Sequence, residues 1–100
     1  MPPATMATKV SVAHKVRDYD VWRPGFDDHA AVRKQHGLTN AEVYRGADDP
    51  NDILVVLDAP SREAVLGFIA DPSLKTTMDN IGVISEPTVV IGEILAAQPA

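Results

Sequence analysis

The sequence lacks cysteine altogether, in a chain of 100 residues. It therefore has no disulfide framework, no thiolate nucleophile and no cysteine-based metal site. A fold without disulfides suits a reducing compartment, so we expect the protein in the cytoplasm.

Basic residues are scarce, with 9 Lys and Arg against 14 Asp and Glu and a formal net charge of -5. Nucleic acids and anionic membranes are bound by clustered Lys and Arg side chains. We therefore expect neither as a partner, and we expect the ligand to be a small molecule or another protein.

Long apolar runs are also missing, because stretches such as 53–57 and 89–91 are far shorter than the roughly 20 residues that span a bilayer. Residues 1–8 contain two prolines and no basic segment followed by an apolar one, which predicts a frayed tail and not a secretion signal. No glycine-rich phosphate loop and no Ser-His-Asp order is present. Nucleotide enzymes and common hydrolases are thereby excluded.

Metal-ligand spacings are absent too. The acidic segment with Asp48, Asp49 and Asp52 lacks the twelve-residue calcium pattern, and turn formation accounts for it. His29 and His36 are seven residues apart, and no His-x-x-x-His pair exists. We expect no metal and no cofactor.

What the sequence does contain is a hairpin at its centre. Turn-forming residues 48–52 separate two strand-like segments, 42–47 and 53–57. The second segment is apolar on both parities, which predicts a strand covered on both faces.

Each of these strands is preceded or followed by a helical pattern and an outer strand. A strand is predicted over 9–16, a helix from the caps at Asp18 and Asp20 to His36, a strand over 39–47, a helix over 61–70 that resumes after an interruption at 71–73, and a strand over 88–95. This β-α-β-β-α-β order predicts an α+β, ferredoxin-like subunit: a four-stranded antiparallel sheet with its helices on one face. Residues 9–95 form one domain between tails at 1–8 and 96–100.

The other face of the sheet predicts a partner. Two helices cover one face, yet the strands at 53–57 and 88–95 offer apolar side chains to both. An uncovered apolar sheet face favours a homodimer in which two sheets pack together. Val56 and Val90 are the positions that we assign to this face, and Tyr44 shares it.

Six residues are candidates for a site. His14 lies on the same strand parity as Val10 and Val12, and the helix over 20–36 has a broad face that combines apolar and polar side chains: Val21, Trp22, Gly25, Phe26, His29, Val32, Arg33 and His36. A buried imidazole needs a hydrogen-bond partner or a cavity, and its ordinary pKa near neutrality suits a general base. We therefore predict a cavity between this helix and the sheet, with His14 and His29 as catalytic residues.

The remaining candidates would bind the substrate: Trp22, Phe26, Tyr44 and Arg45. Arg45 is suited to an anionic substrate oxygen or, equally, to an ion pair across strands. Structural alternatives stay open for the others, since His14 and His29 can be satisfied core residues and Trp22 with Phe26 can be core. His36 suits a charge–dipole role at the helix end.

Several segments resemble the dimeric α/β-barrel superfamily, and most closely its small antibiotic-biosynthesis-monooxygenase-like and cyclase-like proteins. The segments that carry the resemblance are 14–22, 26–29, 43–51 and 71–74, together with Met78, Gly82 and Val83. The resemblance implies ferredoxin-like subunits that pair through their sheets. Activities in the superfamily include cofactor-free quinone-forming monooxygenation, polyketide cyclisation and haem degradation.

Haem degradation does not suit this sequence. Haem-degrading relatives typically carry an Asn on the first strand and a His late in the second helix, and segments 9–16 and 61–70 have neither. Three functions stay open: a cofactor-independent monooxygenase or cyclase acting on aromatic or polyketide-like substrates, a binder of small hydrophobic or aromatic ligands without catalysis, and a stress-related protein-interaction dimer with a closed pocket.

Overall fold

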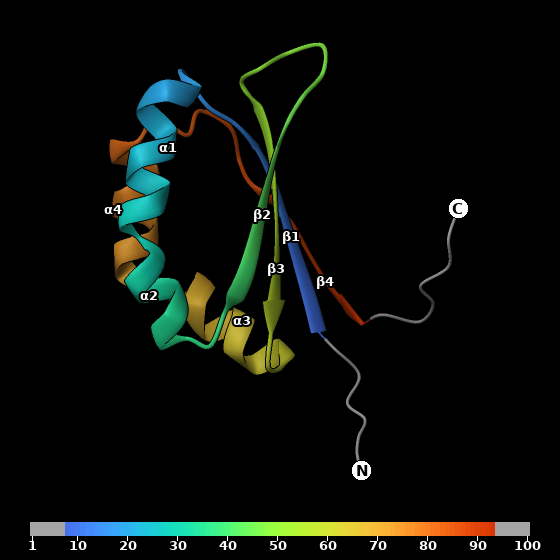
Figure 1. Cartoon of the computed structure of the whole chain (residues 1–100). Coiled ribbons are helices and arrows are strands. Elements are labelled where there is room, and N and C mark those ends of the chain that lie inside the picture. Colours follow the sequence, from blue (N-terminus) through green and yellow to red (C-terminus); the bar gives the residue numbers. More distant parts are fainter. Residues whose placement is uncertain (1–7, 94–100) are drawn as a thin grey trace, which may run out of the picture.

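The computed structural model describes residues 8–93 and contains one four-stranded antiparallel sheet with helices on one face (Figure 1). The elements are β1 (Thr8–Lys15), α1 (Tyr19–Asp28), α2 (Ala30–Gln35), β2 (Thr39–Arg45), β3 (Asp52–Ala59), α3 (Arg62–Ile69), α4 (Pro72–Asn80) and β4 (Thr88–Glu93). The strand order is β2-β3-β1-β4. The ferredoxin-like architecture predicted from the sequence is confirmed.

The register fixes which side chains share a face. His14 pairs with Ile53, Val12 with both Val55 and Val89, and Val10 with Leu57. Residues directly opposite each other in an antiparallel sheet point to the same side. These side chains form the face under the helices, where most of the buried core lies: Val10, Val16, Trp22, Leu38, Ile53, Val55, Leu57 and Val65.

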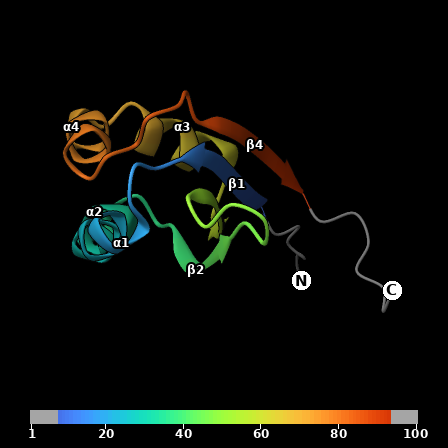
Figure 2. The ribbon, with the colours of Figure 1, turned by 90° about the horizontal axis from the view of Figure 1, so that it is seen from above.

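The strand residues of the opposite parity form the other face of the sheet, which no described element covers. Figure 2, seen from above, shows the helices on one side of the sheet. It carries Tyr44 opposite Leu54, and Glu42 opposite Val56. Val90 lies opposite Ser11 on the same face and is 59% exposed. The predicted placement of Tyr44, Val56 and Val90 on this face agrees with the register.

Helix ends follow the capping chemistry of the sequence. The side chains of Asp18, Ser61 and Asp71 accept hydrogen bonds from backbone N–H groups in the first turns of α1, α3 and α4. Pro72 follows the last of these caps at the start of α4, where a proline costs no intrahelical hydrogen bond.

Two details of the first helix differ from the prediction. One helix was expected up to His36, but the chain forms α1 and α2 with a break at His29. Val21 was expected on the buried face, yet it is 56% exposed, because Trp22 turns inward and takes the central position. The buried stripe is therefore narrower than the sequence pattern suggested.

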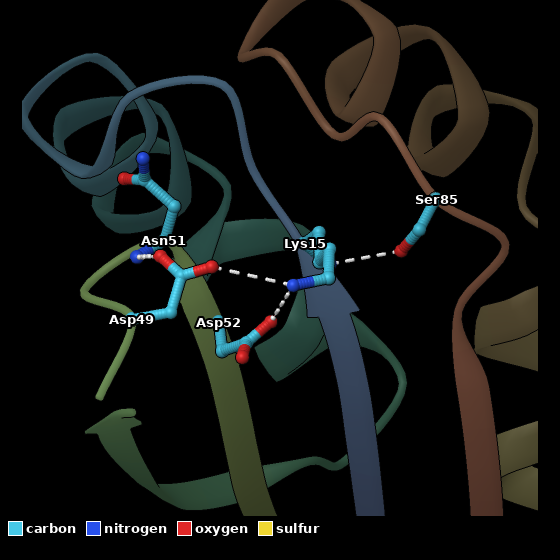
Figure 3. A network of polar contacts seen from close by, with 5 residues as sticks. All are labelled: Lys15, Asp49, Asn51, Asp52 and Ser85. Atoms are coloured by element: carbon cyan, nitrogen blue, oxygen red, sulfur yellow. Dashed lines mark hydrogen bonds and ion pairs between the residues drawn. The ribbon is translucent and has the colours of Figure 1, made fainter. Parts of the chain in front are cut away.

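The acidic turn is part of a polar network at the end of β1 (Figure 3). The Lys15 ammonium lies 2.7 Å from the Asp52 carboxylate and 3.3 Å from that of Asp49, and the backbone N–H of Lys15 donates to Ser85 Oγ. Asn51 donates its N–H to Asp49 and accepts one from Tyr19. The network joins the hairpin turn to the start of α1 and to the segment before β4.

Candidate functional site

A cavity lies between the helices and the covered face of the sheet. Its volume is about 70 Å³, and its walls come from β1, β3 and all four helices or their ends. Most of the lining is apolar, including Val55, Leu57 and Phe68, and its polar members are His14, His29, Arg33 and Thr77. Both histidines that the sequence singled out thus line one cavity.

His14 has no hydrogen-bond partner on either ring nitrogen among the described residues, and both nitrogens are buried. Its ring centroid lies 5.8 Å from that of Trp22. Burial lowers the pKa of His14, because a charged imidazole would lose its hydration in this apolar setting. At neutral pH the ring is therefore neutral, and one of its nitrogens carries an unshared lone pair.

His29 lies at the break between α1 and α2 and is only 8% exposed. Its Nε2 lies 3.1 Å from Ser73 Oγ, and the Ser73 hydroxyl donates to Asp71 Oδ1 over 2.7 Å. Since Ser73 has a single hydroxyl hydrogen and gives it to the carboxylate, Nε2 of His29 is the donor and its Nδ1 holds the lone pair. The hydrogen-bond network fixes the tautomer that a general base at Nδ1 requires.

The chain of hydrogen bonds continues to the third histidine. Asp71 Oδ2 lies 2.9 Å from His36 Nε2, so Asp71 links His36 on the C-terminal side of α2 to Ser73 in α4. The contacts with His36 and Ser73 lower the pKa of Asp71 to about 2. Asp71 is therefore ionised at neutral pH. His36 is the C-cap of α2, at a helix end as expected, and its contact with Asp71 is an additional interaction there.

His29 itself has a lowered pKa. Burial is the main cause and the nearby Arg33 charge is the second, while Asp71 acts in the opposite direction. His29 is thus neutral at rest, and the carboxylate two hydrogen bonds away favours the imidazolium that would form on accepting a proton.

Arg33 is a cavity residue whose functional role the sequence did not suggest. It is 8% exposed, its guanidinium stacks 3.8 Å above the Phe26 ring, and its Nη1 donates to the Phe26 carbonyl over 2.8 Å. Burial lowers its pKa, with Asp27 opposing, but a guanidinium remains protonated. In the sequence, its role could have been inferred from its spacing, since Arg33 lies four residues after His29 and seven after Phe26 on one helical face.

The other predicted binding residues divide into two groups. Phe26 lines the cavity, whereas Trp22 is 1% exposed and packs behind the wall, between His14, Tyr19 and Phe26. The expectation of Trp22 near a cavity mouth is wrong, because its ring fills the core at the start of α1. Trp22 therefore packs against two cavity residues, His14 and Phe26, from the side away from the cavity.

Tyr44 and Arg45 lie in a different place. They line an open depression of about 560 Å³ at the hairpin end of the sheet, where His14 also lies. The Arg45 guanidinium stacks 4.1 Å above the Tyr19 ring, and Tyr44 donates to Glu42 on the uncovered face. The expected single pocket is thus two concavities that share His14.

A second crevice adjoins the histidine cavity. It has a volume of about 250 Å³ and shares with that cavity the walls formed by Val12, Leu57, Phe68, Leu74 and Met78. It extends toward β4 at Pro87 and Val89.

No metal-binding group of three or more His, Cys, Asp or Glu side chains occurs within residues 8–93. None of the helices in this range is long and apolar enough to cross a membrane.

Comparisons with solved structures identify the fold. A candidate antibiotic biosynthesis monooxygenase from Bordetella bronchiseptica superposes with a TM-score of 0.76 at 10% identity, over 92% of this chain and 100% of that one. SnoaB, a cofactor-independent oxygenase from Streptomyces nogalater, has a TM-score of 0.69 at 15% identity, over 95% of this chain and 97% of its own. Rv0793 from Mycobacterium tuberculosis has a TM-score of 0.67 at 16% identity, over 93% and 99%.

No protein-family model matches the sequence, and no curated protein matches it significantly. The superpositions nevertheless show that the chain has the fold of the antibiotic-biosynthesis-monooxygenase-like proteins, as its sequence resemblance implied.

Proposed function

We propose that this protein is a cofactor-independent oxygenase that takes an aromatic substrate into the space between its helices and its sheet. The observation that carries the proposal is His14, a neutral imidazole on the wall of an apolar cavity that also holds His29 and Arg33. Neither of its nitrogens has a hydrogen-bond partner in the described part of the chain. A buried imidazole without a partner is costly, and a ligand that hydrogen-bonds to it would remove that cost. SnoaB, which shares the fold, is itself a cofactor-independent oxygenase.

The proposed chemistry begins with removal of a proton from a phenol or enol. Nδ1 of His29, whose tautomer Ser73 fixes, is the favoured base, with His14 as a second acceptor. The resulting oxyanion is rich in electrons and reacts with O₂ directly. For a ring methylene, one oxygen atom becomes the new carbonyl, and the other leaves as water with the two hydrogens of that carbon.

The protein's residues supply three functions in this proposal. The imidazoles accept the proton, the Arg33 guanidinium stabilises the developing oxyanion, and the apolar walls exclude water. Because burial lowers the pKa of both histidines, they are free to accept a proton at neutral pH. The alternative function, ligand binding without turnover, uses the same cavity.

The proposed working form is a homodimer located in the cytoplasm and joined through the uncovered sheet face. Tyr44, Leu54 and Val90 are 49%, 37% and 59% exposed there, in a strip that water would otherwise cover. Fully burying such a side chain contributes about 1.5–3 kcal/mol, which acts against the entropic cost of association.

Oxygen consumption tests the proposal. Purified protein is incubated with a panel of naphthols, anthrones and related phenols, while oxygen uptake and product mass are followed together. We expect one molecule of O₂ to be consumed per product gaining one oxygen and losing two hydrogens. His14→Ala and His29→Ala should reduce the rate about 100-fold or more, whereas Val21→Ala on the outer surface of α1 should not change it.

Binding of a panel member without oxygen uptake would support the ligand-binding alternative. Turnover that survives both histidine substitutions would show that the reaction occurs elsewhere.

A further inference from the structure

Within residues 8–93, no acidic side chain lines the cavity or its adjoining crevice, although the chain has 14 Asp and Glu and a net charge of -5. The ionisable residues in their walls are His14, His29, Arg33 and Lys75. Lys75 is compensated by Asp79, one helical turn away, at 3.0 Å. Arg33 is therefore the cation in these walls that forms no ion pair within the described residues.

Arg33 is buried without a described carboxylate in ion-pair contact, although the charge of Asp27 acts on its pKa. Among residues 8–93 no ion pair includes it, and its hydrogen bond to the Phe26 carbonyl uses one of five N–H donors. Buried charges in proteins are normally paired, because an unpaired one loses its hydration without compensation. Stacking on Phe26 recovers only part of that loss.

The space around Arg33 also limits the size of a ligand. A cavity of about 150 Å³ is sufficient for one benzene ring. The histidine cavity is about 70 Å³ and the adjoining crevice about 250 Å³. Each further fused ring adds four carbons to the six of benzene, so the two spaces together fit up to about three fused rings and are too small for four.

We propose that this site selects aromatic compounds of up to three fused rings that carry a single carboxylate or phenolate group, bound by Arg33 with the rings in the apolar crevice. The Arg33 fork supplies donors to a carboxylate or phenolate, and a neutral His29 lies on the same wall. Val12, Leu57 and Phe68 provide apolar contacts to the rings. This inference rests on the proposed function in one respect, since it requires that the cavity takes an aromatic ligand.

Titration calorimetry with a matched pair of probes tests the inference. 2-Naphthoate and 2-naphthamide have nearly the same shape, but only the first is charged. We expect 2-naphthoate to bind at least about tenfold more tightly, because a charge-assisted hydrogen bond is stronger than a neutral one. A four-ring carboxylate should bind at least tenfold more weakly than 2-naphthoate.

Two neighbouring variants locate the effect. Arg33→Gln should remove the preference for 2-naphthoate, so that both probes bind with similar affinity, while Lys34→Gln makes the same charge change at an exposed position and should leave the preference as it is. A thermal melt verifies that each variant is folded. If Arg33→Gln does not fold, the relative affinities of the unmodified protein for 2-naphthoate and 2-naphthamide still test whether the site selects an anion.

The outcomes separate the two proposals. Equal affinity for both probes would overturn the charge selection but leave the aromatic site standing. A preference that Lys34→Gln removes and Arg33→Gln retains would place the anion on the surface and also overturn it. Failure of every aromatic probe to bind would overturn the proposed function as well.

Discussion

The two faces of the sheet use the same strands for opposite purposes. The covered face, with His14, Val55 and Leu57, leaves space under its helices, and no acidic side chain of residues 8–93 lines that space. The uncovered face, with Leu54, Val56 and Val90, has no described element over it and places ion pairs at its margins, Lys9 with Asp58 and Lys15 with Asp52. Because successive side chains of a strand point to opposite faces of the sheet, one strand can contribute to a proposed ligand site on one face and to a proposed association surface on the other.

The largest expected effect comes from a substitution on the uncovered face. Val90→Glu places an unpaired charge where the proposed partner would pack, and we expect the dimer dissociation constant to rise at least about 100-fold. Val90 is 59% exposed in the subunit, so the fold should be retained. Analytical ultracentrifugation measures the change.

Val21→Glu is the matched control, because Val21 is 56% exposed on α1. A protein that is already monomeric at micromolar concentration before any substitution would contradict the proposed dimer.

The next effect concerns the covered face, where α1 packs closely on the end of α4. A β-carbon added at Gly25 would overlap the Ile81 side chain. Gly25→Ala should therefore lower the free energy of unfolding by about 1–2 kcal/mol, because overpacking exceeds the gain in helix propensity. Urea denaturation measures it.

Gly92→Ala in β4 is the comparison, since nothing lies within 4 Å of the added carbon there. Equal effects of the two substitutions would show that the contact between α1 and Ile81 does not limit the packing.

A smaller effect is expected in the hydrogen-bond network of His29, Ser73, Asp71 and His36. Ser73→Ala removes the acceptor of the His29 Nε2 hydrogen, so we expect both tautomers to become populated and any turnover by His29 to fall about tenfold. Nitrogen chemical shifts of the His29 ring report the tautomer directly. Ser73→Thr retains the hydroxyl and should restore both. An unchanged tautomer in Ser73→Ala would show that the network does not set it.

The smallest effect is on acid stability. Because the folded pKa of Asp71 is about 2, below its ordinary value of 3.8, the unfolded chain binds more protons in this window. Stability from Asp71 is present above about pH 4 and is lost as the pH falls toward 2. Asp71→Asn should flatten this part of the stability profile in acid denaturation measurements.

Asp49 and Asp58 also have lowered pKa values, from hydrogen bonds with Asn51 and Lys9 respectively, so part of the acid sensitivity should remain in Asp71→Asn. An unaltered profile would mean that the contact with His36 does not stabilise the folded state.

Local sequence determined the architecture. Alternation fixed which strand residues share a face, as Val56 and Val90 show, and side-chain caps at Asp18, Ser61 and Asp71 fixed where helices begin. These features depend on neighbours within a few residues, so they can be read along the chain. The same pattern placed His14 and His29 toward one layer, where they line one cavity.

Only the tertiary structure decided what those histidines contact. Ser73 reaches His29 across 44 residues and Asp71 reaches His36 across 35, through the packing of α4 beside α1 and α2. Trp22 entered the core and Arg33 lost its solvent because of how these helices lie on the sheet. Desolvation and hydrogen bonding between distant elements depend on that placement, which periodicity along one helix does not specify.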